Sequence, residues 1–126
     1  MKQYVILVIT IITLAIFSFW QFKFLNSSQE KINNILGEIE EALKYDNYAV
    51  ASEKHNALEQ QWEQLHNGVD AFSDHLDVET FEKAMSSLRV YISEQERAVA
   101  LEQCSILVQV IEHIVESEKL SVASVF

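Results

Sequence analysis

The sequence contains no proline and only two glycines among its 126 residues, while 49% of its side chains are hydrophobic. A sheet protein needs turn residues about every eight to twelve positions, so this scarcity predicts an all-α fold. The single cysteine excludes an intrachain disulfide and a paired-cysteine metal or redox site. Nineteen acidic against nine basic side chains give a net charge of −10, which opposes binding to phosphate backbones. We therefore expect no nucleic-acid partner. Because no catalytic motif is present, we also expect no cofactor and no enzyme activity.

An uncharged run of seventeen residues extends from Tyr4 to Trp20. At about 1.5 Å per residue a helix over this run covers roughly 25 Å, and the apolar residues up to Leu25, with a snorkelling Lys23, extend it to about 30 Å. The sequence therefore predicts a transmembrane anchor over residues 1–25 that contacts the bilayer through residues 4–25. Bulky residues after the run argue against a cleaved signal peptide. A buried core helix is also disfavoured, because so small a domain could not cover it on all sides.

The distribution of charge favours one orientation for this anchor. Lysines flank the run on both sides, so the positive-inside rule barely discriminates. Residues 26–126, however, hold all nineteen acidic and seven basic side chains, a net charge of −12. An anionic cytoplasmic leaflet would repel such a domain. We expect a single-pass protein of the cell membrane, with its N-terminus inside and its C-terminal domain extracytoplasmic.

Hydrophobic periodicity predicts four amphipathic helices in residues 26–126, after a short polar link at residues 26–29. The dipeptide Asp46-Asn47 interrupts the pattern and can cap the second helix. A third helix follows the junction at residues 72–77, and Ser93–Glu96 has the spacing of a capping box that would start a fourth. The first helix shows the repeating apolar stripe most clearly, at Ile32, Ile35, Leu36, Ile39, Ala42 and Leu43.

An internal comparison supports a break between the last two helices. When the chain is shifted by 49 residues, the break at Asp46-Asn47 falls on Gln95-Glu96, whereas the alternative is one continuous helix from Asp77 to Lys119. The predicted organisation is two repeated helical hairpins, as in a solenoid, over about residues 29–72 and 78–118, with a C-terminal tail at 119–126. A plain four-helix bundle has the same helix count and remains the alternative.

The chain resembles a family of small membrane-anchored proteins of unknown function from Gram-positive spore-forming bacteria. The resemblance rests on the anchor, on Trp62, on the junction Phe72–Glu79 with its Asp74-His75 step, and on the closing Phe126. The family usually ends in an Asn-Ile-Phe-like motif, whereas this chain ends in Ser-Val-Phe. The resemblance implies an all-helical accessory protein that works beside another membrane protein, and it supplies no catalytic residues.

The junction holds four potential metal ligands within six residues: Asp74, His75, Asp77 and Glu79. Such a set would suit a weak metal site if the junction folded back on itself. The favoured interpretation is helix capping, in which Asp77 accepts hydrogen bonds from free amides and Glu79 stabilises the first helical turn. No second histidine cluster is present to complete a metal site.

The stripe His55, Glu59, Trp62 and His66 lies on one helical face, at steps of four, three and four. It could form a ligand site. In the 49-residue alignment, however, His55 falls on Cys104 within an apolar stripe, so core and boundary packing is the favoured interpretation. Because Cys104 has no neighbouring cation to stabilise a thiolate, we expect a buried, inert thiol.

The fourth predicted helix is more apolar along one stripe than its counterpart in the first repeat, because Ile106 and Val110 replace smaller or polar residues. A terminal solenoid helix normally turns a polar face to water, so extra apolar surface marks an interaction site. We predict that the face formed by Val99, Ile106 and Val110 contacts the tail through residues such as Phe126, a second copy of the chain or a partner protein.

Two functional classes follow from these patterns. The first is a membrane-anchored, non-catalytic helical interaction or accessory protein of the bacterial cell envelope, partnered by another membrane or envelope protein or by itself. The alternative is a ligand- or metal-sensing ectodomain that uses the Asp74–Glu79 junction. A metal-dependent shift in melting temperature is required by the second class and not by the first.

Overall fold

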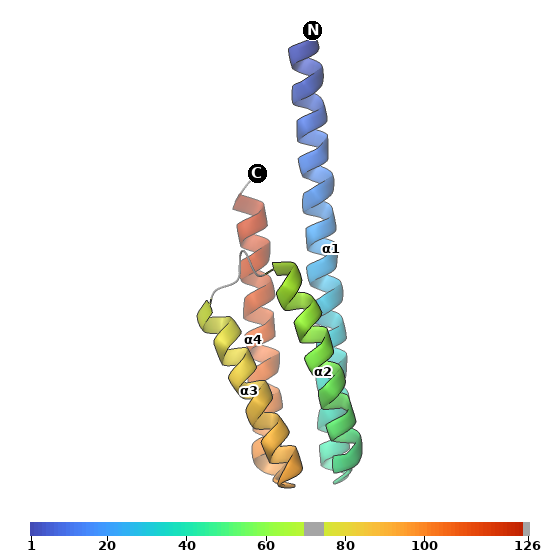
Figure 1. Cartoon of the computed structure of the whole chain (residues 1–126), viewed down its shortest axis with the longest axis vertical. Helices are drawn as coiled ribbons and strands as arrows, with labels where there is room; N and C mark the ends of the chain where they lie inside the picture. The colour runs from blue at the N-terminus through green and yellow to red at the C-terminus, as the bar shows by residue number, and fades with distance from the viewer. Residues whose placement is uncertain (70–74, 125–126) are drawn as a thin grey trace.

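The computed structural model consists of four α-helices and has no strand among the residues it describes, which confirms the all-α fold. The helices are α1 (Lys2–Lys44), α2 (Tyr48–Val69), α3 (His75–Ser93) and α4 (Arg97–Ser124). The structure describes the backbone of residues 1–69 and 75–124 and the side chains of residues 1–67 and 75–120. The helices alternate in direction and form a bundle from which the N-terminal half of α1 projects (Figure 1).

The first helix, α1, is a single element of 43 residues where we predicted an anchor, a polar link and a separate helix. The link prediction was wrong because the core stripe runs through it: Ser28 is small and buried, and it shares a face with Leu25 and Ile32. This stripe continues to Leu43, whereas every side chain from residue 1 to 17 is exposed. One helix thus joins an exposed apolar half to the core of the bundle.

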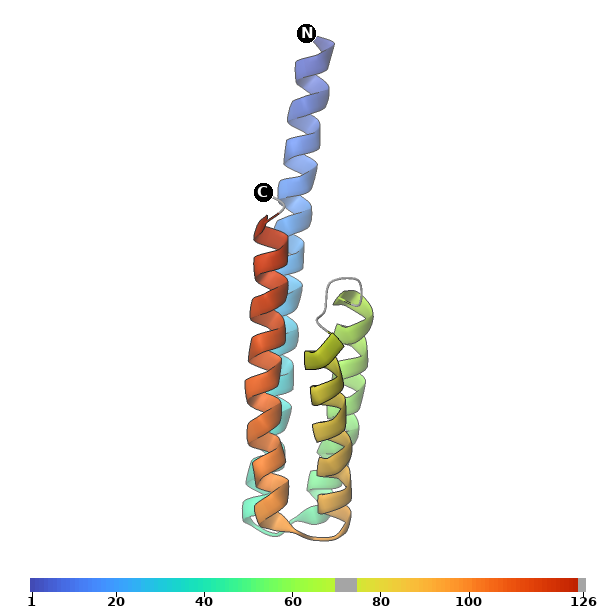
Figure 2. The same ribbon diagram turned by 90° about the vertical axis from the view of Figure 1, so that its left-hand side faces the viewer.

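The core lies between the C-terminal half of α1 and the other three helices. The α1 helix packs against α2 and α4, and α3 packs against α4, while α2 and α3 have the smallest contact of these four pairs. Figure 2 shows the α1–α4 pair beside the α2–α3 pair. Each helix contributes fully buried side chains, among them Leu36, Leu58, Phe81 and Leu107. Burial of each such side chain contributes about 1.5–3 kcal/mol before entropic costs, so packing rather than helix propensity holds the bundle together.

The α1–α2 and α3–α4 turns have the same backbone geometry at positions 49 residues apart. Asp46 and Gln95 lie in the left-handed region, with φ of 55° and 58°. Around each of them two N–H groups bond back into the preceding helix, which is the Schellman motif that ends a helix. The bonds run from Asp46 N to Leu43 O (3.1 Å), Asn47 N to Ala42 O (2.8 Å), Gln95 N to Ile92 O (3.1 Å) and Glu96 N to Tyr91 O (2.9 Å).

These turns decide three predictions about helix ends. The break at Asp46-Asn47 is confirmed, and Asn47 caps α2 because its Oδ1 accepts a hydrogen bond from Val50 N at 3.3 Å. The continuous helix from Asp77 to Lys119 is wrong, because α3 ends at Ser93 and α4 begins at Arg97. The capping box is also wrong in position: Ser93 closes α3, and the carbonyl of Glu96 accepts the first bond of α4, from Ala100 N at 3.0 Å.

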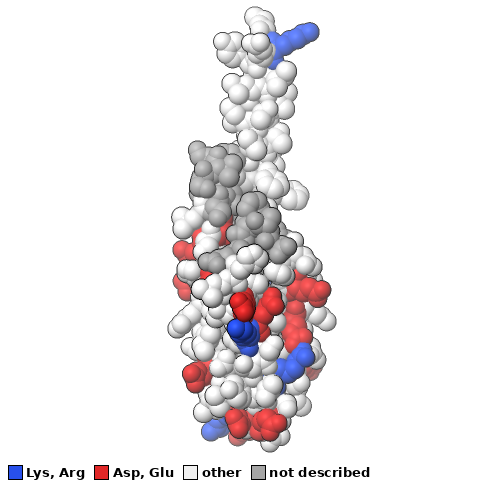
Figure 3. Space-filling view, turned by 60° about the vertical axis from the view of Figure 1, so that its left-hand side comes forward, with Lys and Arg blue, Asp and Glu red and all other residues white. Residues whose placement is uncertain are grey.

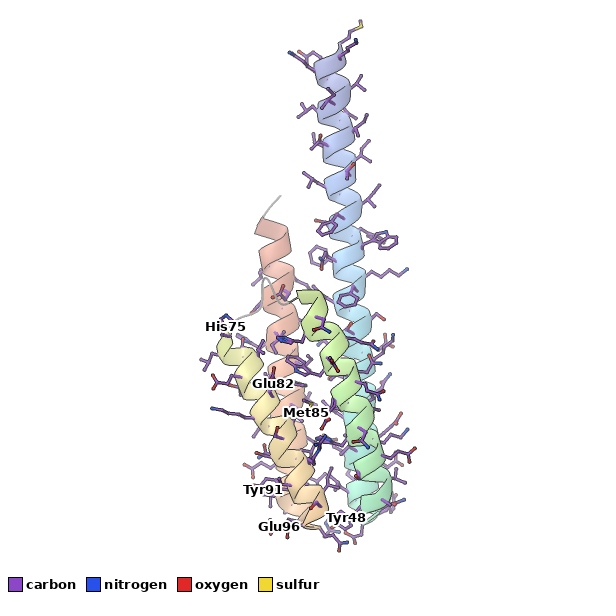
Figure 4. The ribbon with its side chains drawn as sticks, in the orientation of Figure 1. Tyr48, His75, Glu82, Met85, Tyr91 and Glu96 are labelled. Atoms are coloured by element: carbon purple, nitrogen blue, oxygen red, sulfur yellow. The ribbon has the colours of Figure 1, made fainter. Side chains whose placement is uncertain are left out.

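The two turns are joined by side chains. The hydroxyl of Tyr48 lies 3.2 Å from Asp46 Oδ1 and 3.3 Å from the carbonyl oxygen of Gln95. Arg97 approaches Asp46 to 3.4 Å. In Figure 4, Tyr48 and Glu96 lie at this end of the bundle, and His75 lies at the opposite end of α3. The closed ends of both hairpins are thereby fastened to each other.

At the other end, α3 begins at His75, so Asp77 lies in the first helical turn and does not cap the helix. It still favours the helix, because a carboxylate in the first turn complements the macrodipole. The last helix continues through residues 119–124 of the predicted tail and ends at Ser124. As a result α4 extends beyond the near ends of α2 and α3 and lies beside the projecting part of α1 (Figures 1 and 2).

Candidate functional site

A groove with a volume of about 610 Å³ lies between α2 and α3. It forms where the two helices share the smallest contact. Carboxylates from both helices edge this groove, and acidic side chains also predominate on the face of the bundle that Figure 3 shows. Its lining residues are Glu59, Trp62, Glu63, His66, Glu82, Met85, Ser86, Arg89 and Val90.

The floor of the groove is aromatic. Trp62 stacks on Phe81 of α3, with ring centroids 4.2 Å apart and an interplanar angle of 25°. Trp62 also stacks on His66 of α2, with ring centroids 5.6 Å apart and an interplanar angle of 13°. Trp62 is only 5% exposed, and the packing interpretation of this stripe is therefore confirmed for the tryptophan. Stacked aromatic pairs add about 0.5–1.5 kcal/mol beyond the area they bury, so this cluster fastens α2 to α3.

His55 is the most buried titratable group next to the groove, with 1% of its surface exposed. Its Nε2 lies 2.7 Å from the carbonyl oxygen of Met85, which can only accept, so Nε2 carries the proton and donates. Burial lowers the pKa of His55, and the charge of Arg89 lowers it further, while the bond to Met85 acts in the opposite direction. The imidazole is therefore neutral at pH 7, and it joins α2 to α3 inside the bundle.

Glu59 lies between this histidine and the guanidinium of Arg89. Its Oε1 is 3.1 Å from His55 Nδ1 and pairs with the guanidinium of Arg89 on α3. In the neutral tautomer Nδ1 and the carboxylate oxygen are both acceptors, so no hydrogen bond forms between them. The groove is thus closed at its base by a hydrogen bond, an aromatic stack and an ion pair, all between α2 and α3.

The predicted metal ligands of the junction do not meet in the described part of the chain. Asp74 lies outside the described residues, and His75 is exposed. Asp77 Oδ2 lies 2.6 Å from Nδ1 of His113 on α4, and Glu79 pairs with Lys83 at 3.2 Å. Among the residues that the structure describes, no three His, Cys, Asp or Glu side chains are grouped closely enough to hold a metal ion.

The pairing of Asp77 with His113 was missed by the sequence analysis. The two residues are 36 positions apart, and the 49-residue alignment placed His113 on Gln64, which suggested an ordinary surface position. No local pattern marks such a pair. Its effect is to tie the first turn of α3 to α4 near the α2–α3 junction.

The residues predicted for interaction on α4 are half-buried. Ile106 and Val110 pack against the core of the bundle, and Val99 is also partly covered. Phe126 lies outside the described residues. The apolar face of α4 is therefore partly packed against the bundle and partly exposed to solvent.

Cys104 is fully buried among the core residues. Burial, with the nearby charge of Glu40 adding to it, raises the pKa of the thiol to about 12. A thiol with this pKa stays protonated at neutral pH and is a poor nucleophile. The expected inert, buried thiol is confirmed.

The most unusual surface of the molecule is the exposed half of α1. Ile6, Ile9 and Phe17 are each more than half exposed, and this half is uncharged in Figure 3 up to the cation at its tip. Among the described residues, α1 and the segment Arg97–Leu120 of α4 are long and apolar enough to cross a membrane. Only 6% of the apolar window in α1 is buried, compared with 33% of the window in α4. An open hollow of about 510 Å³ lies on α1 between Thr13 and Phe24.

Together these features define an antiparallel four-helix bundle whose first helix continues outward as an exposed apolar rod. The chain belongs to the family DUF4363, a domain of unknown function, whose sequence model matches residues 19–125. This agrees with the expected membership of an uncharacterised family. No curated protein and no solved structure matches the chain.

Proposed function

We propose that the chain is a membrane-anchored, non-catalytic accessory protein of the cell envelope that acts by binding another envelope protein. One observation carries the proposal: α1 passes without a break from an apolar half that nothing in the bundle covers into the bundle core. Soluble proteins rarely expose apolar patches larger than a few hundred Å², and a bilayer is the environment in which such a helix is stable.

The proposed orientation places the N-terminus inside and the bundle outside the cytoplasm. It is supported by the net charge of −12 on residues 26–126, which an anionic cytoplasmic leaflet would repel. The resemblance to proteins of Gram-positive spore formers is consistent with a single-membrane envelope.

The proposed interaction surface is the apolar face of α4. Val99, Ile106 and Val110 leave part of their apolar surface open between the core and the solvent. We further propose that the bundle arose from two copies of a helical hairpin, since the two turns repeat the same hydrogen bonds 49 residues apart. The second copy of the hairpin then differs from the first in carrying an apolar stripe on its second helix, α4, at Ile106 and Val110.

Cysteine labelling of intact cells tests the anchor and its orientation. In a Cys104→Ser background, Gln60→Cys places a thiol on the exposed face of α2, and Lys2→Cys places one before the apolar run. A membrane-impermeant reagent should label the first variant in intact cells and the second only after lysis. Labelling in the reverse order would refute the orientation. Recovery of the protein in the soluble fraction would refute the anchor.

In-cell cross-linking with mass spectrometry tests the interaction role. The double variant Ile106→Gln with Val110→Gln should keep its helicity and lose cross-links to the partner. Val90→Gln is the matched control, because Val90 is 55% exposed and belongs to α3, whereas the stripe belongs to α4. If the double variant retains its cross-links and loses much of its stability, the face belongs to the core and the interaction proposal is wrong.

A further inference from the structure

The end of α4 lies at the height of the aromatic segment of α1. Arg97, the first residue of α4, pairs at 3.4 Å with Asp46, which follows the end of α1. Because α1 and α4 run in opposite directions (Figure 1), each residue forward along α4 from this pair corresponds to about one residue back along α1. With about 1.5 Å of rise per residue in both, Leu120 lies at about the level of Phe24, and the end of α4 at about the level of Trp20.

Figures 1 and 2 agree with this register. In both views α4 runs past the ends of α2 and α3 and reaches the projecting half of α1. The α2–α3 pair does not accompany α4 over its last turns. Leu120, the last residue of α4 whose side chain is described, is 71% exposed.

The residues at this height have the composition of a membrane interface. On α1 they are Lys23 and the rings of Phe19, Trp20 and Phe24, all exposed. On α4 they are Lys119 and Leu120. Aromatic rings and snorkelling lysines are enriched where a protein crosses from headgroups into hydrocarbon.

Along the bundle axis, the exposed acidic side chains of α1 and α4 lie farther from the apolar half of α1 than Lys23 and Lys119 do. On α1 the first carboxylate is Glu30, and residues 120–126 have no charged side chain. Glu118, the last carboxylate of α4, is 2% exposed, so it adds almost no negative surface. On the side of the bundle, Lys23 and Lys119 are therefore the charged side chains nearest to the apolar half of α1, and both are cations that suit anionic phospholipid headgroups.

We propose that the last turns of α4, from Lys119 onward, enter the headgroup and upper acyl region of the same bilayer that holds α1. This inference rests on the proposed membrane anchor. The bilayer then contacts the protein at two points, and this second contact holds the bundle upright on the membrane surface. Leu120 exchanges water for lipid, while Lys119 and Lys23 reach phosphate groups.

Site-directed spin labelling of the full chain tests this contact. In a Cys104→Ser background, a nitroxide is attached at Leu120→Cys, and matched controls carry it at Ile12→Cys in the run and at Val90→Cys on α3. The proteins are reconstituted in vesicles of equal parts phosphatidylcholine and phosphatidylglycerol. The ratio of accessibility to oxygen over accessibility to a water-soluble nickel chelate reports depth. We expect the ratio to fall from Ile12 to Leu120 to Val90.

A label at Ser124→Cys gives a second reading if the Leu120 variant loses helicity, and its ratio should exceed that of Leu120. If the labels on α4 match Val90 while Ile12 remains in lipid, the α4 contact is refuted and the anchor stands. If Ile12 itself has the ratio of Val90, the proposed anchor is refuted as well. The two failures are thereby distinguishable.

Discussion

Replacing Gln95 by glycine should stabilise the bundle. Gln95 is held at φ 58° in the α3–α4 turn, a conformation that costs a non-glycine residue about 1–2 kcal/mol. Glycine removes this cost but loses about 0.5–1 kcal/mol more backbone entropy on folding. We therefore expect Gln95→Gly to raise the free energy of unfolding by about 0.5–1 kcal/mol. The carbonyl that accepts from Tyr48 belongs to the backbone and is kept.

The assay is urea unfolding of the full chain in detergent micelles, followed by circular dichroism. Asp46→Gly is the matched comparison, because Asp46 has the same conformation at φ 55° in the α1–α2 turn. That variant also loses the carboxylate that pairs with Arg97 and accepts from Tyr48, so its gain should be smaller. A lower midpoint for Gln95→Gly would refute the conformational argument. Equal gains in both variants would show that the contacts of Asp46 add nothing.

Three further changes can be measured in the same assay. Trp62→Ala should cost about 3–5 kcal/mol, because the indole stacks on Phe81 in the core, and a loss under about 1 kcal/mol would contradict this packing. Gly37→Ala should add about 0.5–1 kcal/mol, since the new methyl group meets nothing within 4 Å on α1, and any loss would show a hidden contact. Because burial lowers the pKa of His55, the unfolded chain binds its proton more readily than the folded one. Stability should therefore fall as the pH drops below about 6.5, and less so in His55→Gln.

Helical periodicity predicted most of the core, because the apolar stripes of this chain have few interruptions. The positions of Leu36, Leu58 and Leu107 followed from the stripe alone. Self-comparison placed the second break more accurately than local motif reading did. Shifting Asp46-Asn47 by 49 residues gives Gln95-Glu96, the observed turn, whereas the capping-box motif selected Ser93, which ends α3. The backbone ends α3 with a Schellman motif, and side-chain spacing does not encode that preference.

The continuity of α1 could have been found from the sequence, but composition pointed elsewhere. Asn26, Ser27 and Ser28 are weak helix formers and favour a link by propensity. Tertiary packing overrides that preference, because Ser28 is buried on the same helix face as Leu25 and Ile32. The relevant signal was the unbroken spacing of the core stripe through the polar residues.

The sequence predicted those features of the candidate site that depend on a single helix, and it did not predict the contacts between helices. The stripe that contains His55 and Trp62 gave their burial, since both lie on one face of α2. Their partners on α3, the carbonyl of Met85 and the ring of Phe81, depend on how two helices meet. The bond between Asp77 and His113 depends on a third helix, and no pattern within one helix carries that information.

The unbroken α1 also has a mechanical consequence. Each residue of an α-helix turns the chain by about 100° and advances it by about 1.5 Å, so the exposed half and the core half of α1 are locked in rotational phase. One residue inserted between Lys23 and Ile32 would twist the two halves against each other by about 100°. Any protein that binds the N-terminal half of α1 in a fixed orientation therefore also fixes the direction, about the helix axis, in which the groove between α2 and α3 faces. The same holds for the apolar face of α4.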